Sequence, residues 1–474
     1  MKKSGPLACH VAAAESAHGD GRALVAGAGF RQSNYPMRVV LIWLFAAACG
    51  SAVDWPQWRG PFFNGSTTET NLPSSWSGTS NLLWALPLPG PGSATPVVCS
   101  NRVFLLAADK SADKVLALAA DAQTGRPLWA KSLGPDRKAP SGNNDAATPS
   151  PVTDGQTVWF MTGTGLLTAL TVDGRLRWQR NLAAEDGGDF VLNHGYSSSP
   201  LLFDGRLYVA VLQNDNPQRW GQRPAQKKKT DSYLLAIDPA NGKTLWKQLR
   251  PTNATDESRE GYVTPYPFVW KQRREIVLIG GECVTGHDAA TGAELWRWWF
   301  SPPDRQEGQH VEATPVALDD LVFVIRARGR PLFALRPEGR GELDDRIVAW
   351  RFEENRGQVP SPLLYKNRLY VVQDNERKLV CLNPQTGEIV WQQQLPVRVR
   401  LEASPTAADD KIYCISLLGE VVVLAAGDKP AVLGRVTFPE PLCRSTIVAA
   451  NGRLYIRTAR HLYCVGHGSA QHAP

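Results

Sequence analysis

The sequence lacks the short motifs that identify the commonest catalytic and metal-binding proteins. It contains no His-Glu-X-X-His, no Cys-X-X-Cys, no Gly-X-X-X-X-Gly-Lys-Ser/Thr phosphate loop and no Gly-X-Ser-X-Gly elbow. These motifs are typical of zinc proteases, redox or zinc sites, nucleotide phosphate sites and serine hydrolases. No local motif therefore indicates any of these activities.

Cysteine is scarce and scattered, with 8 residues in 474 and no two of them adjacent. Six follow residue 52, mostly within apolar, strand-like runs, and these are Cys99, Cys283, Cys381, Cys414, Cys443 and Cys464. Because disulfide frameworks usually show closer and more regular spacing, we expect these six to be buried thiols.

A large charge excess is missing as well. The formal net charge is +7, and the first 52 residues supply three of these positive charges, which leaves +4 for the rest of the chain. This small excess gives no reason to expect a nucleic acid or a membrane surface as partner.

The most apolar segment is too short to be a lasting membrane span. Residues 39–48 are apolar, follow Arg38 and precede small residues, which is the pattern of an export signal. We expect a signal peptide over residues 37–52, a translation start at Met37, and a mis-assigned upstream extension over residues 1–36. Cleavage after Ala52 gives a soluble protein, and cleavage before Cys49 gives a lipid anchor on that cysteine; both alternatives stay open.

What the sequence does contain is an internal repeat. Eight units open on a Thr-Pro or Ser-Pro step and an apolar run, although the last has lost its proline. They begin at Ala94, Ala147, Ser198, Val263, Glu312, Pro360, Glu402 and Arg444. Each continues with a polar turn and apolar strands, and Asp-Gly or Asn-Gly between such runs predicts a hairpin. A period of this length, with this content, indicates four-stranded antiparallel units in a radial array.

Many units close with a Thr-Gly or Asn-Gly turn that leads to a tryptophan. The glycine is expected at positive φ, and the tryptophan on the outermost strand. The tryptophans with this spacing are Trp84, Trp129, Trp178, Trp246, Trp296, Trp350 and Trp391. We expect them to pack between neighbouring sheets, and a fully buried one should cost about 3–5 kcal/mol on replacement by alanine.

The first of these tryptophans indicates how the array closes. Trp84 precedes the first unit, and the eighth unit has no fourth strand of its own. Pairing the two removes both open sheet edges. We therefore predict an all-β fold, an eight-bladed β-propeller of four-stranded antiparallel blades over residues 82–466, closed by an N-terminal strand. Residues 53–81 are expected to form an ordered arm, residues 467–474 a disordered tail, and the run Lys227, Lys228 and Lys229 a solvated loop.

The repeat resembles that of the quinoprotein dehydrogenases, the pyrroloquinoline quinone (PQQ) repeat. The resemblance lies in Thr/Ser-Pro, Asp-Gly-Arg-Leu-Tyr, Leu-X-Ala-Leu-Asp and Thr-Gly-X-X-X-Trp, and covers about residues 82–466. The segment "DWPQWRGPFFNG" followed by "LPSSWS" is similar to the start of exported bacterial PQQ-like propellers of no established activity. The repeat also occurs in the propeller lipoprotein of the outer-membrane β-barrel assembly machinery. It therefore indicates the fold and leaves the activity open.

The dehydrogenase resemblance implies a vicinal cysteine pair, a Ca²⁺ ion held by carboxylates and amides, and an aspartate base. This chain has no adjacent cysteines and no acidic run with recognisable calcium-loop spacing. We therefore expect no cofactor, and PQQ with Ca²⁺ stays as the alternative.

Polar side chains gather just before the Thr/Ser-Pro steps, where the chain enters the innermost strands. They are Asn144, Asp145, His194, Tyr196, Arg259, Glu260, Tyr262, His310, Glu312, Arg356, Arg400, Glu402 and Arg444. Radial symmetry would bring them together at one mouth of the channel, where arginines match carboxylates.

These observations favour a non-catalytic binding scaffold in the periplasm or cell envelope. Its partners would be envelope proteins or a small carboxylated ligand, with no nucleic acid, and with a membrane only through the anchor at Cys49. A monomer is expected. The alternative is a PQQ-dependent alcohol or sugar dehydrogenase.

Overall fold

The computed structural model describes residues 53–215, 230–301, 309–326, 329–438 and 440–468. The expected signal peptide, the segment before it, Cys49, the lysine run and residues 469–474 lie outside the described residues.

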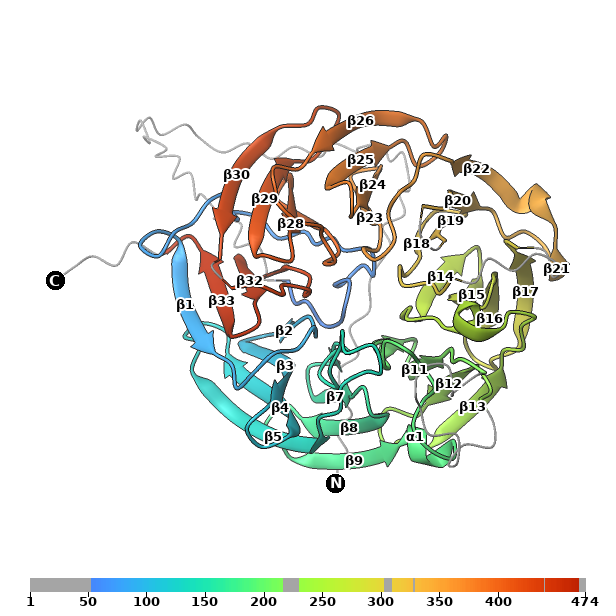
Figure 1. Cartoon of the computed structure of the whole chain (residues 1–474), viewed down its shortest axis with the longest axis horizontal. Helices are drawn as coiled ribbons and strands as arrows, with labels where there is room; N and C mark the ends of the chain where they lie inside the picture. The colour runs from blue at the N-terminus through green and yellow to red at the C-terminus, as the bar shows by residue number, and fades with distance from the viewer. Residues whose placement is uncertain (1–52, 216–229, 302–308, 327–328, 439, 469–474) are drawn as a thin grey trace, which may run out of the picture. The chain divides into compact units, whose positions relative to one another are not determined.

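Eight antiparallel sheets stand around a central channel, so the predicted eight-bladed propeller is confirmed (Figure 1). The strands of the first four blades are β2 (Val97–Cys99), β3 (Arg102–Asp109), β4 (Lys114–Asp121) and β5 (Pro127–Pro135); β6 (Val152–Thr153), β7 (Thr157–Met161), β8 (Leu166–Thr171) and β9 (Leu176–Asn181); β10 (Leu201–Phe203), β11 (Arg206–Val211), β12 (Tyr233–Ile237) and β13 (Thr244–Leu249); β14 (Tyr266–Trp270), β15 (Arg273–Gly280), β16 (Cys283–Asp288) and β17 (Glu294–Trp299).

The remaining blades follow the same order. Their strands are β18 (Val316–Leu318), β19 (Leu321–Ile325), β20 (Leu332–Leu335) and β22 (Val348–Phe352); β23 (Leu363–Tyr365), β24 (Arg368–Gln373), β25 (Lys378–Leu382) and β26 (Ile389–Gln394); β27 (Thr406–Ala408), β28 (Lys411–Ile415), β29 (Glu420–Ala425) and β30 (Val432–Thr437); β31 (Val448–Ala450), β32 (Arg453–Arg457), β33 (His461–Gly466) and the N-terminal β1 (Leu82–Pro87). The antiparallel pair of β1 with β33 closes the ring, as predicted.

One blade departs from the predicted four strands. A short strand, β21 (Gly341–Leu343), adds to the outer edge of β17 in parallel and makes the fourth blade five-stranded. It lies in the connection before β22, where the fifth unit carries extra residues in place of the short Thr-Gly turn. The described helices are short: α1 (Leu182–Glu185), η3 (Asp256–Arg259) and η4 (Asp345–Ile347). None in the described ranges could cross a bilayer.

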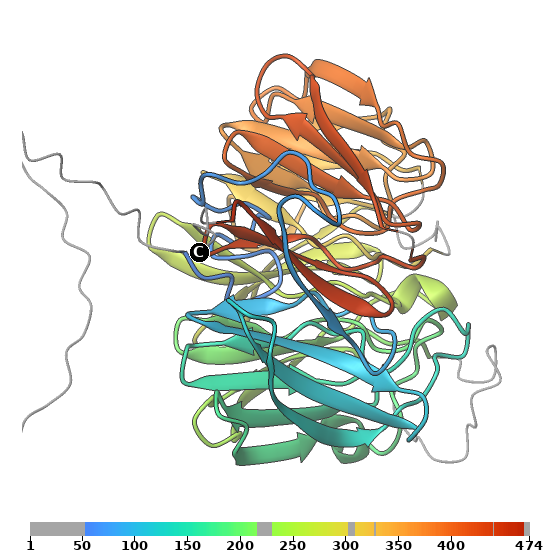
Figure 2. The ribbon, with the colours of Figure 1, turned by 90° about the vertical axis from the view of Figure 1, so that its left-hand side faces the viewer.

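The middle strands of the blades are mostly buried. In β7, β12 and β19 every residue is buried, because a neighbouring blade covers each face of the sheet (Figure 2). The outermost strands β9 and β13 instead alternate between exposed and half-buried residues. The six described cysteines are all buried and unpaired, which confirms the expectation of buried thiols.

The Thr/Ser-Pro steps form a ring of hydrogen bonds around the channel. At seven of the eight junctions between blades, the backbone N–H of one Ser or Thr donates to the hydroxyl of the corresponding residue in an adjacent blade, at 2.9 to 3.1 Å. This hydroxyl ring consists of Thr95, Ser150, Ser199, Thr264, Thr314, Ser361, Ser404 and Thr446, all of them buried. Since the next residue is usually proline, which biases the chain toward an extended backbone, each unit enters its innermost strand in the same way.

The N-terminal arm closes one end of the channel. Trp55 bridges Val98 in the first blade and Gln57 bridges Val152 in the second, whereas the carbonyl of Asn64 accepts from the N–H of Leu364 in the sixth. The second and sixth blades stand opposite each other in a ring of eight, so the residues between cross the channel. The buried Arg59 fixes the crossing, because its guanidinium donates to Pro405 O at 3.1 Å and to Pro362 O at 2.5 Å.

Six of the seven tryptophans lie on outermost strands, whereas Trp296 lies on β17, whose outer edge is covered by β21. Five of the seven pack on the turn glycine of the next blade. The pairs are Trp84 on Gly125, Trp129 on Gly174, Trp178 on Gly242, Trp246 on Gly292 and Trp350 on Gly387. All five glycines have positive φ, as predicted. Trp391 donates to Gly427 O of the next blade. Trp296 differs, because it is fully buried and donates to Glu275 within its own blade at 2.7 Å.

The hydroxyl ring should contribute measurably to stability. Thr314→Val keeps the side-chain shape but leaves the buried N–H of Thr264 without its acceptor, which should cost about 1–3 kcal/mol. Thr314→Ser keeps the hydroxyl and serves as the control. Denaturant unfolding that ranks the valine and serine variants as equally stable would contradict this role.

The close approach of tryptophan to glycine yields a second prediction. A Cβ at Gly242 would lie 2.7 Å from Trp178, whereas one at Gly205 in the same blade would meet nothing within 4 Å; both residues have positive φ. Gly205→Ala should therefore cost about 1 kcal/mol from the backbone alone, and Gly242→Ala should cost about 1–3 kcal/mol more from the overlap. If thermal unfolding shows that the two variants lose equal stability, the indole of Trp178 moves aside at no cost and the prediction is contradicted.

Candidate functional site

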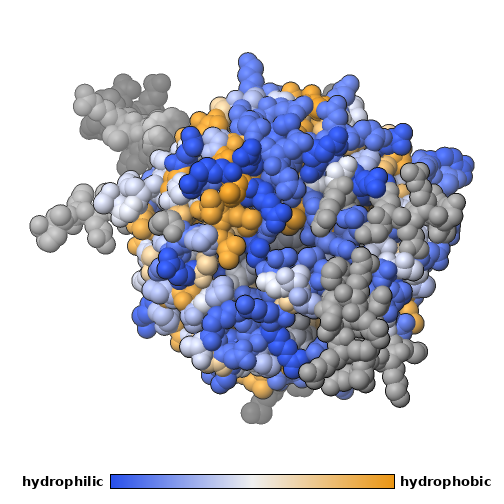
Figure 3. Space-filling view, in the orientation of Figure 1, coloured by the Kyte–Doolittle hydropathy of each residue, from blue (hydrophilic) through white to orange (hydrophobic). Residues whose placement is uncertain are grey.

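A polar cavity of about 710 Å³ occupies the channel and is lined from all eight blades. Trp58, on the crossing arm, is the arm residue that lines it, so the arm provides its floor. Hydrophilic residues gather around the centre of the ring on the face shown in Figure 3. The channel is therefore a pocket with a closed end.

Residues of the hydroxyl ring form part of the cavity wall. Six of its members line the cavity: Thr95, Ser150, Ser199, Thr264, Ser404 and Thr446. Sequence reasoning used the Thr/Ser-Pro steps only to locate strands and missed them as lining residues. The signal was present, because every step repeats a hydroxyl at the same place beside the channel.

Nine of the thirteen predicted residues line this cavity. They are Asn144, His194, Tyr262, His310, Glu312, Arg356, Arg400, Glu402 and Arg444. Neighbouring polar residues that the prediction missed include Asn143, Gln358, Asn375 and Glu376.

Four predicted residues do not line the cavity, because partners outside it hold them. Tyr196 is buried and donates to Ala210 O at 3.0 Å. Arg259, at the end of η3, reaches outward to Asp215 at 3.2 Å.

Glu260 and Asp145 lie behind the wall. Glu260 accepts from Asn193 N and from Asn214, and burial raises its pKa. Asp145 accepts from the N–H of Ala147 two residues on, and burial raises its pKa as well. Neither carboxylate is directed at a ligand.

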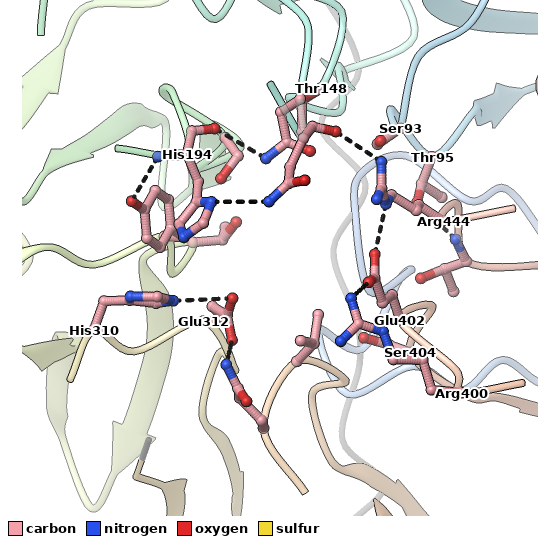
Figure 4. A pocket seen from close by; sticks show the side chains of 18 of the residues that line it. Ser93, Thr95, Thr148, His194, His310, Glu312, Arg400, Glu402, Ser404 and Arg444 are labelled. Atoms are coloured by element: carbon pink, nitrogen blue, oxygen red, sulfur yellow. Dashed lines mark hydrogen bonds and ion pairs between the residues drawn. The ribbon is translucent and has the colours of Figure 1, made fainter. Parts of the chain in front are cut away.

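One wall of the cavity is cationic. Glu402 accepts from both Arg400 and Arg444, and Arg444 also donates to Asn143 O at 2.8 Å, which joins the first and last parts of the ring (Figure 4). The single carboxylate therefore holds two guanidinium groups side by side. Arg356, which precedes the sixth blade, is exposed, and among the described residues it donates to the carbonyls of Glu353 and Asn355.

The opposite wall carries a histidine between two carboxylates. His310 Nδ1 lies 2.7 Å from Glu257 and Nε2 lies 3.2 Å from Glu312, whose other oxygen accepts from Gln358 at 2.8 Å. Burial opposes the charged imidazole, but the bonds to the two carboxylates outweigh it and raise the pKa of His310 to about 9. Burial likewise acts to raise the pKa of Glu312, and His310 outweighs it and holds that pKa below the usual value.

Tyr262 supports this wall from behind. Its ring meets His310 and His194 edge-on, with centroids 5.2 and 5.7 Å away. Its hydroxyl donates to the carboxylate of the buried Glu260 and accepts from the backbone N–H of His194 at 3.1 Å. The two imidazoles, 5.0 Å apart between centroids, are thus held on one support.

Comparison with known proteins agrees with this architecture. A family described as "Outer membrane protein assembly factor BamB" matches residues 67–230, 190–342 and 339–429. Among solved structures, BamB from Moraxella catarrhalis aligns with a TM-score of 0.52 at 14% identity, over 81% of this chain and 99% of its own. Quinohemoprotein alcohol dehydrogenase from Comamonas testosteroni aligns with a TM-score of 0.61 at 12% identity, over 89% of this chain and 82% of its own. At these identities the likeness concerns the fold.

Curated relatives match shorter segments. The dehydrogenase subunit of the alcohol dehydrogenase (quinone) of Komagataeibacter europaeus is 29% identical over 176 residues, which is 34% of this chain and 23% of that protein. Quinohemoprotein alcohol dehydrogenase ADH-IIG of Pseudomonas putida is 28% identical over 247 residues, 47% of this chain and 28% of that protein. The chain thus spans about a quarter of the length of these relatives. The family match extends over most of the chain, from the arm to the seventh blade, and this protein therefore belongs to the family of PQQ-like repeat propellers described as outer membrane protein assembly factor BamB.

Proposed function

We propose that this protein is an exported, non-catalytic binding protein of the cell envelope whose channel cavity holds a small carboxylated ligand. The observation that carries the proposal is the cationic wall. Within the part of the chain that the structure describes, Nε and Nη2 of Arg356 and Nε and Nη1 of Arg400 have no hydrogen-bond partner. Both side chains belong to the cavity lining.

The remaining lining suits the same kind of ligand. Guanidinium groups pair with carboxylates through two parallel hydrogen bonds, and the hydroxyls and amides around the channel offer donors to any remaining oxygen. Trp58 on the floor provides one flat apolar face. A cavity of this size, closed at one end, fits a small molecule, or the carboxylate end of a peptide that enters from the mouth.

The family supports an envelope location. Its description names an outer-membrane assembly factor, and the signal expected at residues 37–52 supports export. A scaffold that captures acidic segments of envelope proteins at the cavity mouth is the protein-binding form of the same proposal.

A quinoprotein dehydrogenase is the alternative, and its calcium ion does not fit the cavity. No aspartate belongs to the described lining, and its glutamates are Glu312, Glu376 and Glu402. Glu312 is bound to His310 and Gln358, and Glu402 to two arginines. Ca²⁺ needs six to eight oxygen ligands, which these engaged carboxylates do not assemble. The six described cysteines are separate and buried, so none forms a vicinal pair.

A binding titration tests the proposal. Citrate and PQQ, both tricarboxylates, are titrated into the purified full chain with and without Ca²⁺. Binding is followed by calorimetry and by the intrinsic tryptophan fluorescence, to which Trp58 contributes. We expect saturable binding that does not need calcium. The double variant Arg356→Gln/Arg400→Gln should bind at least about tenfold more weakly, since a charged hydrogen bond contributes about 1.5–3 kcal/mol.

Two further variants control this experiment. Arg346→Gln removes an exposed arginine paired with Asp344 outside the cavity and should change nothing. Glu402→Gln removes the carboxylate that competes for Arg400 and Arg444 and should tighten binding. Equal affinity in all variants would contradict the proposal, and calcium-dependent binding of PQQ alone would favour the dehydrogenase.

A further inference from the structure

A second cluster of ligating side chains lies on the wall opposite the arginines. His194 and His310 both line the cavity, and Glu257 approaches from η3 with a carboxylate oxygen 2.7 Å from His310 Nδ1. One donor atom from each of the three residues lies within 4.8 Å of the other two. We infer that His194, Glu257 and His310 form a binding site for a divalent transition-metal ion of the zinc class.

The second nitrogen of each imidazole already has an oxygen partner. His194 Nδ1 lies 3.0 Å from Ser141 Oγ and 3.5 Å from Asn143 Nδ2, and His310 Nε2 lies 3.2 Å from Glu312, which Gln358 holds in turn at 2.8 Å. Histidines that bind metals usually donate their other N–H to such an acceptor, which fixes the tautomer and the orientation of the ring. In the tautomer whose Nδ1–H donates to Ser141 Oγ, His194 binds the metal through Nε2, and His310 binds it through Nδ1.

The support behind the cluster limits the motion of the rings. Tyr262 packs edge-on against both imidazoles, and its hydroxyl accepts from the backbone N–H of His194 while it donates to the buried Glu260. Two ligands of a tetrahedral zinc ion, each about 2.1 Å from the metal, stand about 3.4 Å apart. Small side-chain rotations within this frame would therefore bring the three donor atoms to bonding distance.

The ligand set selects the class of ion. Two imidazole nitrogens and one carboxylate suit zinc and its neighbours in the first transition row, whereas calcium and magnesium prefer oxygen ligands alone. The ion takes the place of the proton shared by His310 Nδ1 and Glu257, and this proton leaves to solvent. Three protein ligands leave a fourth position on a tetrahedral ion, and it faces the cavity because both histidines line it.

The test measures metal binding alone and does not rest on the proposed carboxylate ligand. The full chain, produced without a polyhistidine tag and stripped with a chelator, is titrated with Zn²⁺ by calorimetry and with Co²⁺ by visible absorption. We expect one ion per chain, a dissociation constant in the micromolar range or tighter, and the intense spectrum of four-coordinate cobalt. Ser141→Ala, which removes the acceptor that orients His194, should weaken binding by roughly 10-fold.

Variants of the ligands make the result decisive. His310→Gln and His194→Gln should each lower the affinity at least about 100-fold, more than loss of an orienting residue does, while thermal unfolding checks that each variant is folded. His461→Gln is the matched control, because His461 also pairs with a glutamate, Glu440 at 2.6 Å, but lies outside the cavity. Zinc affinity that is only millimolar, or that survives both ligand variants, or that falls equally in His461→Gln, would overturn the inference.

Discussion

The hydroxyl ring around the channel is the constraint on which the rest of the structure depends. At seven of the eight junctions, the backbone N–H of this ring would be buried without a partner if the adjacent blade did not supply its hydroxyl. Because the donor and acceptor sit at the same place in every unit, the ring sets the angle between neighbouring blades. The tryptophan–glycine contacts join neighbouring blades again at their outer edges. The pairing of β1 with β33 closes the ring of blades.

The ring also explains how one repeat can build a differentiated cavity. Residues that precede each Thr/Ser-Pro step are carried to the channel wall, where the blades need not be alike. One side places Arg400 and Arg444 around Glu402, and the other places His194 and His310 against Tyr262. The two walls face each other across the cavity, whose floor is the arm. One ligand could therefore contact a guanidinium group on one wall and a metal ion at the proposed site on the other.

The sequence allowed the fold to be predicted, and nine of the thirteen predicted site residues line the cavity, because both follow the repeat. It did not show which polar residues turn away from the channel. Arg259 belongs to η3, an insertion whose end directs it to Asp215, and Glu260 is drawn inward by Asn214. Both partners lie in a different part of the chain, and β21 likewise depends on a pairing within an insertion. Such contacts do not recur from unit to unit, so the repeat in the sequence does not reveal them. Trp58 lies outside the repeat and lines the cavity because the arm crosses the channel.

Hydrogen–deuterium exchange of the native protein, resolved to single amides, tests most directly whether the hydroxyl ring is a rigid frame. The amides of Thr95, Ser150, Ser199 and Thr264 border a wet cavity, yet each donates to a buried hydroxyl. We expect these amides to exchange only through global unfolding, as slowly as the buried strands β7 and β12. Exchange as fast as that of the exposed hairpin turns would show that the channel wall opens locally, and would contradict a fixed frame for the cavity.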